Sequence, residues 1–379
     1  MLPFPCRTGA VKIGKPGRDA PVLLTCNFGL TVERVKRALA GRDAWLLVAN
    51  SRGVNVWCAA TGGLLTNHDV VSVVKTSGIE ELVDHRELIL PQLAATGVEG
   101  RVVRKKTGWR VVWGPVDAAA IPAFLDGGGV KTPAMGRVTF PLGQRLEMAV
   151  AWAFPISLLA LPVAFFSTST ALLLAGLTWA HAIVLFAGFP LYESWLRGDR
   201  GGKAHIGLVF FDFGERGAPL VLWLLTLLCA VALGALGGDL SWAMLLRWGL
   251  VAGVVALVLG IDLSGSTPTY KSGLHADRLL AITLEESRCR GVGFCLESCP
   301  VEVFELDRER SLAVLASKER CVQCGACVVQ CPFDALYFED PAGGRITPET
   351  VRSFKLNLMG TRSVATSAEV EHEPPAENS

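Results

Sequence analysis

Hydrophobic and polar positions divide the chain into an N-terminal mixed region, a central apolar region and a C-terminal mixed region. From Met148 to Tyr192 no residue is charged, and two further apolar runs cover Ala218–Gly238 and Trp242–Ile261. A membrane core of about 30 Å is crossed by roughly 20 helical residues. The first run is long enough for two spans hinged at Ser167–Thr170. The pattern therefore predicts four transmembrane helices within residues 147–261.

Basic residues gather on one side of these predicted spans. Lys131 and Arg145 precede the first span, and Arg197 and Arg200 lie between the second and the third. Short loops rich in Lys and Arg face the cytoplasm. The sequence predicts a multi-pass protein of the cytoplasmic membrane with both flanking domains in the cytoplasm. The short apolar stretch Gly207–Phe213 is predicted to be interfacial or re-entrant, with a fifth span as the alternative.

The first 140 residues alternate between short β-rich runs and helical patterns. Pro21–Cys26, Ala44–Ala49 and Arg110–Trp113 are apolar runs, and Thr31–Leu39 has helical periodicity with Thr31 as the expected N-cap. Strands that alternate with helices form parallel sheets, which bind ligands at the carboxyl ends of their strands. We expect a Rossmann-like α/β domain over residues 1–140.

Cysteines concentrate near the C-terminus, where seven of the eleven lie between Cys289 and Cys331. The second half of this region has the bacterial ferredoxin spacing C-x2-C-x2-C-x3-C-P. Its members are Cys321, Cys324, Cys327 and Cys331, followed by Pro332. Four-cysteine zinc sites, the alternative, use two separated C-x2-C pairs. The spacing therefore favours an α+β two-cluster ferredoxin domain over residues 285–345, joined by a linker at 262–284.

The first cysteine motif of this region is incomplete, because Val292 stands where a ligand is expected between Cys289 and Cys295. In two-cluster ferredoxins the last cysteine of each motif ligates the other cluster. One [4Fe-4S] cluster would then be held by Cys299, Cys321, Cys324 and Cys327. Cys289, Cys295 and Cys331 remain for a second cluster, either [3Fe-4S] or [4Fe-4S] with an exchangeable iron, and an empty remnant is a third alternative. Clusters of this kind fit a reducing compartment.

Charge and the chain ends add little to this picture. The net charge of +1 gives no argument for a nucleic-acid partner. The N-terminus lacks a charged start followed by an apolar core, so no cleaved signal peptide is expected. Residues 346–379 form a C-terminal extension whose tail is rich in Pro and Glu and is predicted to be disordered.

Several segments carry a family resemblance. The stretches PVLLTCNFGL, NVWCAA, LILPQLAATGV, WRVVWGPVDAAAIPAFL and GRVTFPLGQRLEM resemble the corrinoid-binding domain of the mercury-methylating corrinoid membrane protein, a relative of the corrinoid iron–sulfur protein of acetyl-CoA synthesis. The Cys-rich end, with RITPETVRSFKLNLMG, resembles the partner ferredoxin of that protein. The chain thus resembles a fusion of the two.

The resemblance implies a role for Cys58, which would otherwise be interpreted as a small buried hydrophobic residue. In the resembled family, the cysteine of this motif is the lower axial thiolate ligand of the corrinoid cobalt. Asn55, Val56, Trp57 and Ala59 would shape the helix that carries Cys58.

The function implied by the resemblance is that of a membrane-anchored corrinoid-dependent methyltransferase with a built-in ferredoxin. It would take a methyl group from a methylated folate or a methyl-donor protein and pass it to mercury(II). A low-potential electron donor would reduce cobalt through the clusters. No cysteine follows Cys331 to deliver mercury, so a methyltransferase with another acceptor is one alternative. A membrane-bound electron carrier whose N-terminal domain only docks a partner is another.

Overall fold

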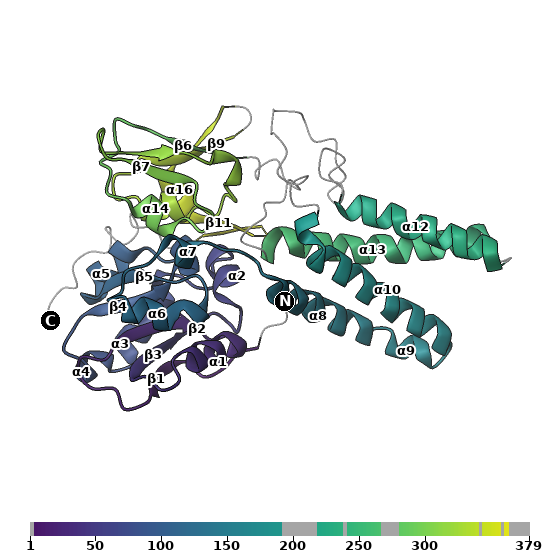
Figure 1. The fold of residues 1–379 in the computed structure, drawn as a ribbon, viewed down its shortest axis with the longest axis horizontal. Helices are drawn as coiled ribbons and strands as arrows, with labels where there is room; N and C mark the ends of the chain where they lie inside the picture. The colour runs from purple at the N-terminus through teal and green to yellow at the C-terminus, as the bar shows by residue number, and fades with distance from the viewer. Residues whose placement is uncertain are drawn as a thin grey trace, which may run out of the picture. The chain divides into compact units, whose positions relative to one another are not determined.

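The computed structural model describes residues 4–191, 218–237, 241–266, 280–340, 343–357 and 360–363 (Figure 1). The chain forms two compact units, one within Thr139–Leu279 and one that joins Leu2–Val138 to Leu280–Ser379. The second unit contains every residue predicted to bind a cofactor. The predictions for Gly207–Phe213 and for the tail beyond residue 363 lie outside the described residues.

A five-stranded sheet forms the centre of the α/β domain, in the order β1-β3-β2-β4-β5. Neighbours among β2 to β5 are parallel, and β1 pairs antiparallel with β3. The strands are β1 (Gly9–Ile13), β2 (Val22–Cys26), β3 (Ala44–Ala49), β4 (Glu87–Pro91) and β5 (Arg110–Gly114). The chain continues from β2 to β3 on one side and then to β4 on the other. The carboxyl ends of β2 and β4 therefore flank the switch point at which such sheets bind ligands.

Helices and short 3-10 turns connect these strands. They are α1 (Gly29–Ala38), α2 (Val56–Thr61), α3 (Asn67–Thr76), α4 (Ile79–Leu82), η1 (Gln92–Thr96), α5 (Gly100–Thr107), η2 (Ala118–Ala120), α6 (Ile121–Asp126) and α7 (Pro133–Gly136). Every residue of β2 is buried, as expected for a central parallel strand. Helix α1 buries Val32 and Val35 in the same core as Leu23 of β2.

The predicted N-cap of α1 at Thr31 is wrong. The helix begins at Gly29, and the N-cap position is Phe28. The Gly29 N–H donates to the carbonyl of Phe4 at 2.9 Å, so the N-terminal segment sets the start of the helix.

The Cys-rich region contains two similar short helices, α14 (Phe294–Ser298) and α15 (Ala326–Gln330). Each follows a glycine with positive φ and each ends at a cysteine followed by proline. A three-stranded sheet of order β10-β9-β6 and a β7-β8 hairpin accompany them. The remaining elements are β6 (Ala281–Leu284), β7 (Phe304–Asp307), β8 (Leu312–Leu315), η4 (Lys318–Arg320), β9 (Leu336–Glu339), β10 (Arg345–Ile346), α16 (Pro348–Ser353), β11 (Phe354–Asn357) and β12 (Gly360–Ser363).

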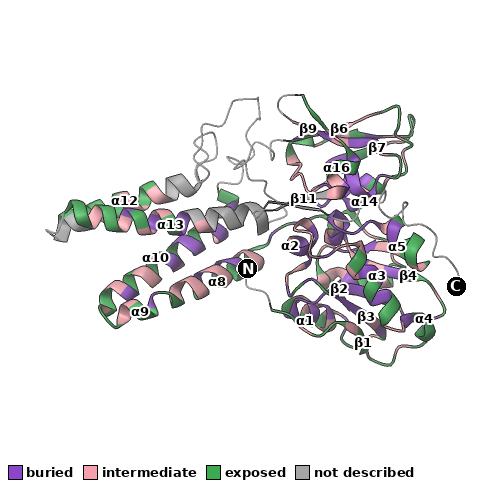
Figure 2. Ribbon diagram, turned by 180° about the vertical axis from the view of Figure 1, so that it is seen from behind, coloured by how far each residue is buried: buried purple, intermediate pink, exposed green. Residues whose placement is uncertain are grey.

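The other unit is helical. Its helices are α8 (Leu142–Leu158), α9 (Leu161–Ala164), α10 (Thr168–Ala187), α12 (Ala218–Gly237) and α13 (Trp242–Ser266). Ala153 of α8 packs in one core with Ala182 and Phe186 of α10. Outward-facing positions include large apolar side chains such as Phe165 and Phe166, and Figure 2 shows exposed residues along these helices.

Within the described residues, α10 is the one helix long and apolar enough to cross a membrane, with 20 residues and a mean hydropathy of 1.9. Helix α8 has 17 residues. The described apolar parts of α12 and α13 are Trp223–Ala232 and Trp242–Ala256. The prediction of four spans, or five, is therefore wrong, and so is the multi-pass location in the cytoplasmic membrane that was derived from it.

This error has a physical cause. The apolar run from Met148 looked continuous, but its helix starts earlier, at Leu142, and ends at Leu158. The next helical turn, α9, has only four residues and includes Pro162. Hydropathy identifies where apolar residues lie and does not show where a helix begins and ends.

Candidate functional site

Cys58 is the third residue of α2, the helix that follows β3. The Asn55 side chain is the N-cap and accepts a hydrogen bond from the Cys58 N–H at 2.8 Å. Val56, Trp57 and Ala59 are buried, whereas Cys58 is only half-buried. The five predicted residues therefore form one short capped helix whose packing leaves the thiol partly accessible.

Asn27 holds the loop that leads into this helix. It directly follows β2, and its Oδ1 accepts hydrogen bonds from the Ser51 N–H at 2.8 Å, the Ser51 hydroxyl at 2.9 Å and the Gly53 N–H at 2.9 Å. Gly53 has φ +73°, and a Cβ there would lie 2.5 Å from the Pro5 nitrogen. Asn27 was not among the site residues predicted from the sequence. A polar residue directly after a buried parallel strand does indicate the ligand-binding edge of the sheet.

Helix α2 packs closely against η1, the turn that follows β4. A Cβ on Gly97 would lie 2.4 Å from the Leu65 carbonyl oxygen and 2.7 Å from the Ala60 carbonyl oxygen. Only glycine permits this approach. The Cys58 helix is therefore held at the carboxyl edge of the sheet, beside the switch point.

The seven C-terminal cysteines fall into two groups by their mutual influence. Burial raises the pKa of Cys295 to about 12, and Cys331 and Cys289 add to the effect. Burial also raises the pKa of Cys327 well above its ordinary value, with Cys324, Cys299 and Cys321 as the next causes and Cys295 as a smaller one. The larger influences are consistent with the crossed arrangement, three cysteines with Cys295 and four with Cys327, and the influence of Cys295 on Cys327 shows that the two groups are close neighbours.

Backbone groups are placed to support thiolates in both groups. The N–H groups of Val303 and Gln323 donate to the sulfurs of Cys299 and Cys321 at 3.4 Å. Those of Ala313 and Ala335 donate to Cys289 and Cys331 at 3.5 and 3.4 Å. Burial raises the pKa of Cys295, Cys299 and Cys327, and such thiols stay protonated unless a metal binds the thiolate. The donor set therefore fits iron–sulfur clusters, whose ligands are thiolates that accept such bonds.

The three-cysteine group lines a cavity. Cys289, Cys295 and Cys331 line it together with Val292, which is 51% exposed at its edge. Val292 occupies the place of the missing ligand and carries no donor atom. Within the described ranges, no three His, Cys, Asp or Glu side chains already form a site for a single metal ion.

The α/β domain and the Cys-rich region meet at η1, which contacts α14 and α15 as well as α2. The Gln330 side chain of α15 donates to the carbonyls of Ala95 and Val98 at 2.8 and 2.7 Å. The Gln92 side chain of η1 donates to the Cys299 carbonyl at 3.0 Å. One turn therefore touches the Cys58 helix and both helices of the cysteine motifs.

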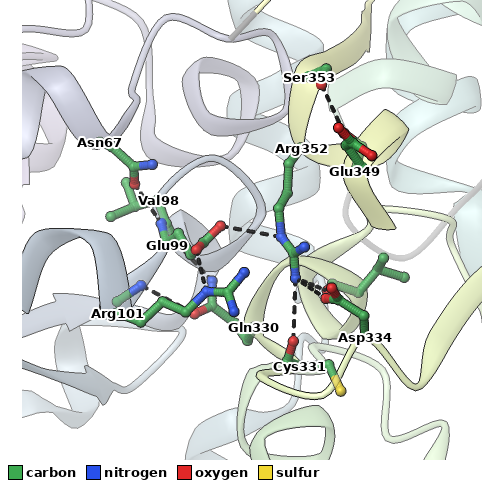
Figure 3. A network of polar contacts seen from close by, with 12 residues as sticks. Asn67, Val98, Glu99, Arg101, Gln330, Cys331, Asp334, Glu349, Arg352 and Ser353 are labelled. Carbon is green, nitrogen blue, oxygen red and sulfur yellow. Dashed lines mark hydrogen bonds and ion pairs between the residues drawn. The ribbon is translucent and has the colours of Figure 1, made fainter. Parts of the chain in front are cut away.

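A buried ionic cluster reinforces this contact (Figure 3). Arg352 of α16 lies between Glu99 of the α/β domain at 3.2 Å and Asp334 at 2.5 Å, and it donates to the Cys331 carbonyl at 3.2 Å. Arg101 also pairs with Glu99. Glu99 is 3% exposed and Arg352 7%. The cluster contains two guanidinium groups and two carboxylates, so its charges cancel, as is needed when charged groups are buried.

Comparisons with known proteins match the two parts of this unit separately. Residues 2–125 match the family model described as CO dehydrogenase/acetyl-CoA synthase delta subunit. Residues 288–335 match the 4Fe-4S dicluster domain. The second match supports iron–sulfur chemistry for the cysteine motifs.

Similar curated proteins are gamma subunits of the acetyl-CoA decarbonylase/synthase complex. Those of Archaeoglobus fulgidus and Methanopyrus kandleri are 38% and 40% identical over 126 and 124 residues, or 33% and 32% of this chain. The protein of Methanothermobacter thermautotrophicus is 38% identical over 120 residues, or 31% of the chain. The chain spans about a quarter of the length of these relatives, 26% in each case.

The resemblance to the mercury-methylating corrinoid membrane protein and its partner ferredoxin is therefore wrong, and with it the predicted membrane-anchored mercury methylation. The similarity is to subunits of the acetyl-CoA decarbonylase/synthase complex. The segments that carried the resemblance lie mostly in the sheet and the Cys58 helix, within the matched residues 2–125. These segments are typical of the α/β domain itself and do not identify a methyl acceptor.

Proposed function

We propose that the chain is a corrinoid iron–sulfur protein of methyl transfer, in which the α/β domain binds the corrinoid and the Cys-rich domain supplies electrons to it. The expected bounds are 1–140 and 285–345, and we extend the second domain to include β6 and all of β10, which pair with β9. The observation that carries the proposal is the position of η1 between the Cys58 helix and the two cysteine-motif helices. Both proposed cofactor sites then contain a helix that contacts η1, the turn at the carboxyl edge of the sheet.

Cys58 is the residue proposed to hold the corrinoid through its cobalt. A corrinoid bound there would supply a cobalt able to accept and pass on a methyl group. Asn55 caps the helix through the Cys58 N–H. The buried Val56, Trp57 and Ala59 fix the helix against the domain, so that the thiol is presented from a rigid turn.

The Cys-rich domain is proposed to bind two clusters. Cys299, Cys321, Cys324 and Cys327 would hold one [4Fe-4S] cluster. The cavity group of Cys289, Cys295 and Cys331 would hold a [3Fe-4S] cluster or a [4Fe-4S] cluster with one exchangeable iron, since Val292, which lines the same cavity, has no donor atom. Such clusters supply single electrons at low potential.

The relatives are named as subunits of a complex, which supports protein partners for this chain as well. We propose a methyl-donor protein or methylated folate as the source of the methyl group. A low-potential electron donor would reduce the clusters from outside.

The test is the metal content and visible spectrum of the anaerobically purified chain supplied with a corrinoid. We expect stoichiometric cobalt in the wild type, a changed cobalt spectrum in Cys58→Ala, and an unchanged spectrum in the control Cys6→Ala, another half-buried thiol of the same domain. Iron without cobalt in the wild type would contradict corrinoid binding and leave an electron carrier. A Cys58→Ala spectrum identical to the wild type would contradict the role of this thiol.

A further inference from the structure

Lys131 places a half-buried ammonium group at the end of a cysteine-motif helix. Its Nζ donates to the Glu297 carbonyl at 2.8 Å and to the Gln92 side-chain oxygen. Glu297 belongs to the last turn of α14 and lies two residues before Cys299 and two residues after Cys295. The cation belongs to the α/β domain, whereas the carbonyl that it contacts belongs to the Cys-rich domain.

Gln92 ties this cation to a proposed cluster ligand. Its amide nitrogen donates to the Cys299 carbonyl at 3.0 Å and to the Gly136 carbonyl at 2.9 Å, while its oxygen accepts from Lys131. Gln92 is 1% exposed. The Gln92 side chain therefore links the ammonium group of Lys131 to the backbone of Cys299.

The charge of Lys131 is less compensated than that of the buried Arg352. Arg352 has Glu99 and Asp334 as ion-pair partners. The described salt bridges include none for Lys131, which contacts a carbonyl and an amide oxygen, and the Glu297 carboxylate attracts it without forming an ion pair. More positive charge therefore remains beside Cys299 than near Cys331, where Arg352 is neutralised.

We propose that Lys131 raises the reduction potential of the cluster bound by Cys299, Cys321, Cys324 and Cys327, so that the α/β domain sets the potential of this cluster by docking. The inference rests on the proposed binding of that cluster. It goes beyond it by assigning a tuning residue that lies outside both cysteine motifs.

The physical reason is electrostatic. Reduction adds one electron, and thus one negative charge, to the cluster and its thiolates. A half-buried cation stabilises the reduced form, and its partial burial limits the screening of this attraction. Burial and hydrogen bonding around the sulfurs are established determinants of cluster potential.

The experiment is a redox titration of the loaded full-length chain followed by electron paramagnetic resonance, with iron content measured for each variant. We expect Lys131→Gln to lower the reduction potential of the four-cysteine cluster by at least about 59 mV. For one electron this is a tenfold decrease in the equilibrium constant for reduction. Lys131→Arg keeps the charge and should stay near the wild type. Lys75→Gln, on the exposed face of α3, is the matched surface control, and the potential of the three-cysteine cluster is the internal reference.

An unchanged potential in Lys131→Gln with intact clusters would overturn the proposal. An equal drop in Lys131→Arg would also overturn it, because packing and not charge would then be responsible. If Lys131→Gln loses the cluster, Gln92→Glu tests the same point by adding a negative charge beside Lys131 and should lower the same potential. A wild type without clusters would instead contradict the proposed function.

Discussion

Asn55 and Asn27 illustrate how single side chains fix the backbone around Cys58. Asn55 satisfies the Cys58 N–H at the start of α2, and Asn27 holds Ser51 and Gly53 in the preceding loop. Neither contact involves the thiol itself. The accessibility of Cys58 therefore depends on residues whose role is to shape the chain.

Removal of the cap should loosen this turn. We expect Asn55→Ala to lower the free energy of unfolding by about 1 kcal/mol, because the Cys58 N–H loses its acceptor at a helix start. Asn55→Asp keeps an acceptor oxygen and should lose much less. Denaturant titration of both variants is the measurement, and equal stability of Asn55→Ala and the wild type would show that the cap contributes nothing.

At the residue scale, the sequence predicted the cysteines as cluster ligands because their spacing is itself chemical information. It also predicted that Val292 stands in the place of a missing ligand. Gln92, Lys131, Glu99 and Arg352 were not found, because each is an ordinary polar residue in sequence. Their importance comes from contacts between residues more than 160 positions apart.

At the scale of elements, β2, β3 and β5 were predictable from the sequence, and β1 and β4 were not. β2 and β3 are continuous apolar runs and were expected nearly residue for residue. β1 is an antiparallel edge strand with alternating half-buried and exposed positions, and its apolar pattern is weaker because one of its sides has no partner strand. β4 lies inside the sheet between β2 and β5, but it begins at an exposed glutamate and ends in proline, so its apolar run is short.

The contact of Lys131 with α14 gives the domain interface a pH dependence. Burial lowers the pKa of Lys131 from 10.5 to about 8. Between these values the unfolded chain binds more protons than the folded chain, so stability rises with pH across this window. Below pH 8 Lys131 is protonated in both the folded and the unfolded chain, so it adds no pH dependence to the free energy of unfolding.

We therefore expect the free energy of unfolding of the wild type, relative to Lys131→Met, to increase by up to about 3 kcal/mol as the pH rises through this window. Anaerobic denaturant titrations of the two proteins at several pH values measure the difference. A difference that is flat, or that falls as the pH rises, would contradict the half-buried position of the ammonium group.

At the scale of the whole molecule, the second unit joins segments from both ends of the chain into one compact body. Gln330, Gln92 and the Glu99–Arg352 pair bind the Cys-rich domain to η1, the turn that also supports the Cys58 helix. Sequence patterns showed the two domains but could not show that they dock on this edge. The docking implies that the clusters reduce a cofactor held by the same chain.

Intramolecular electron transfer tests this claim most directly. The chain loaded with corrinoid and clusters is reduced rapidly under anaerobic conditions, and the oxidation of the clusters and the reduction of cobalt are followed together by their absorbance. We expect the two changes to share one rate constant that is independent of protein concentration. A rate proportional to protein concentration, or reduced clusters that leave cobalt oxidised, would contradict it.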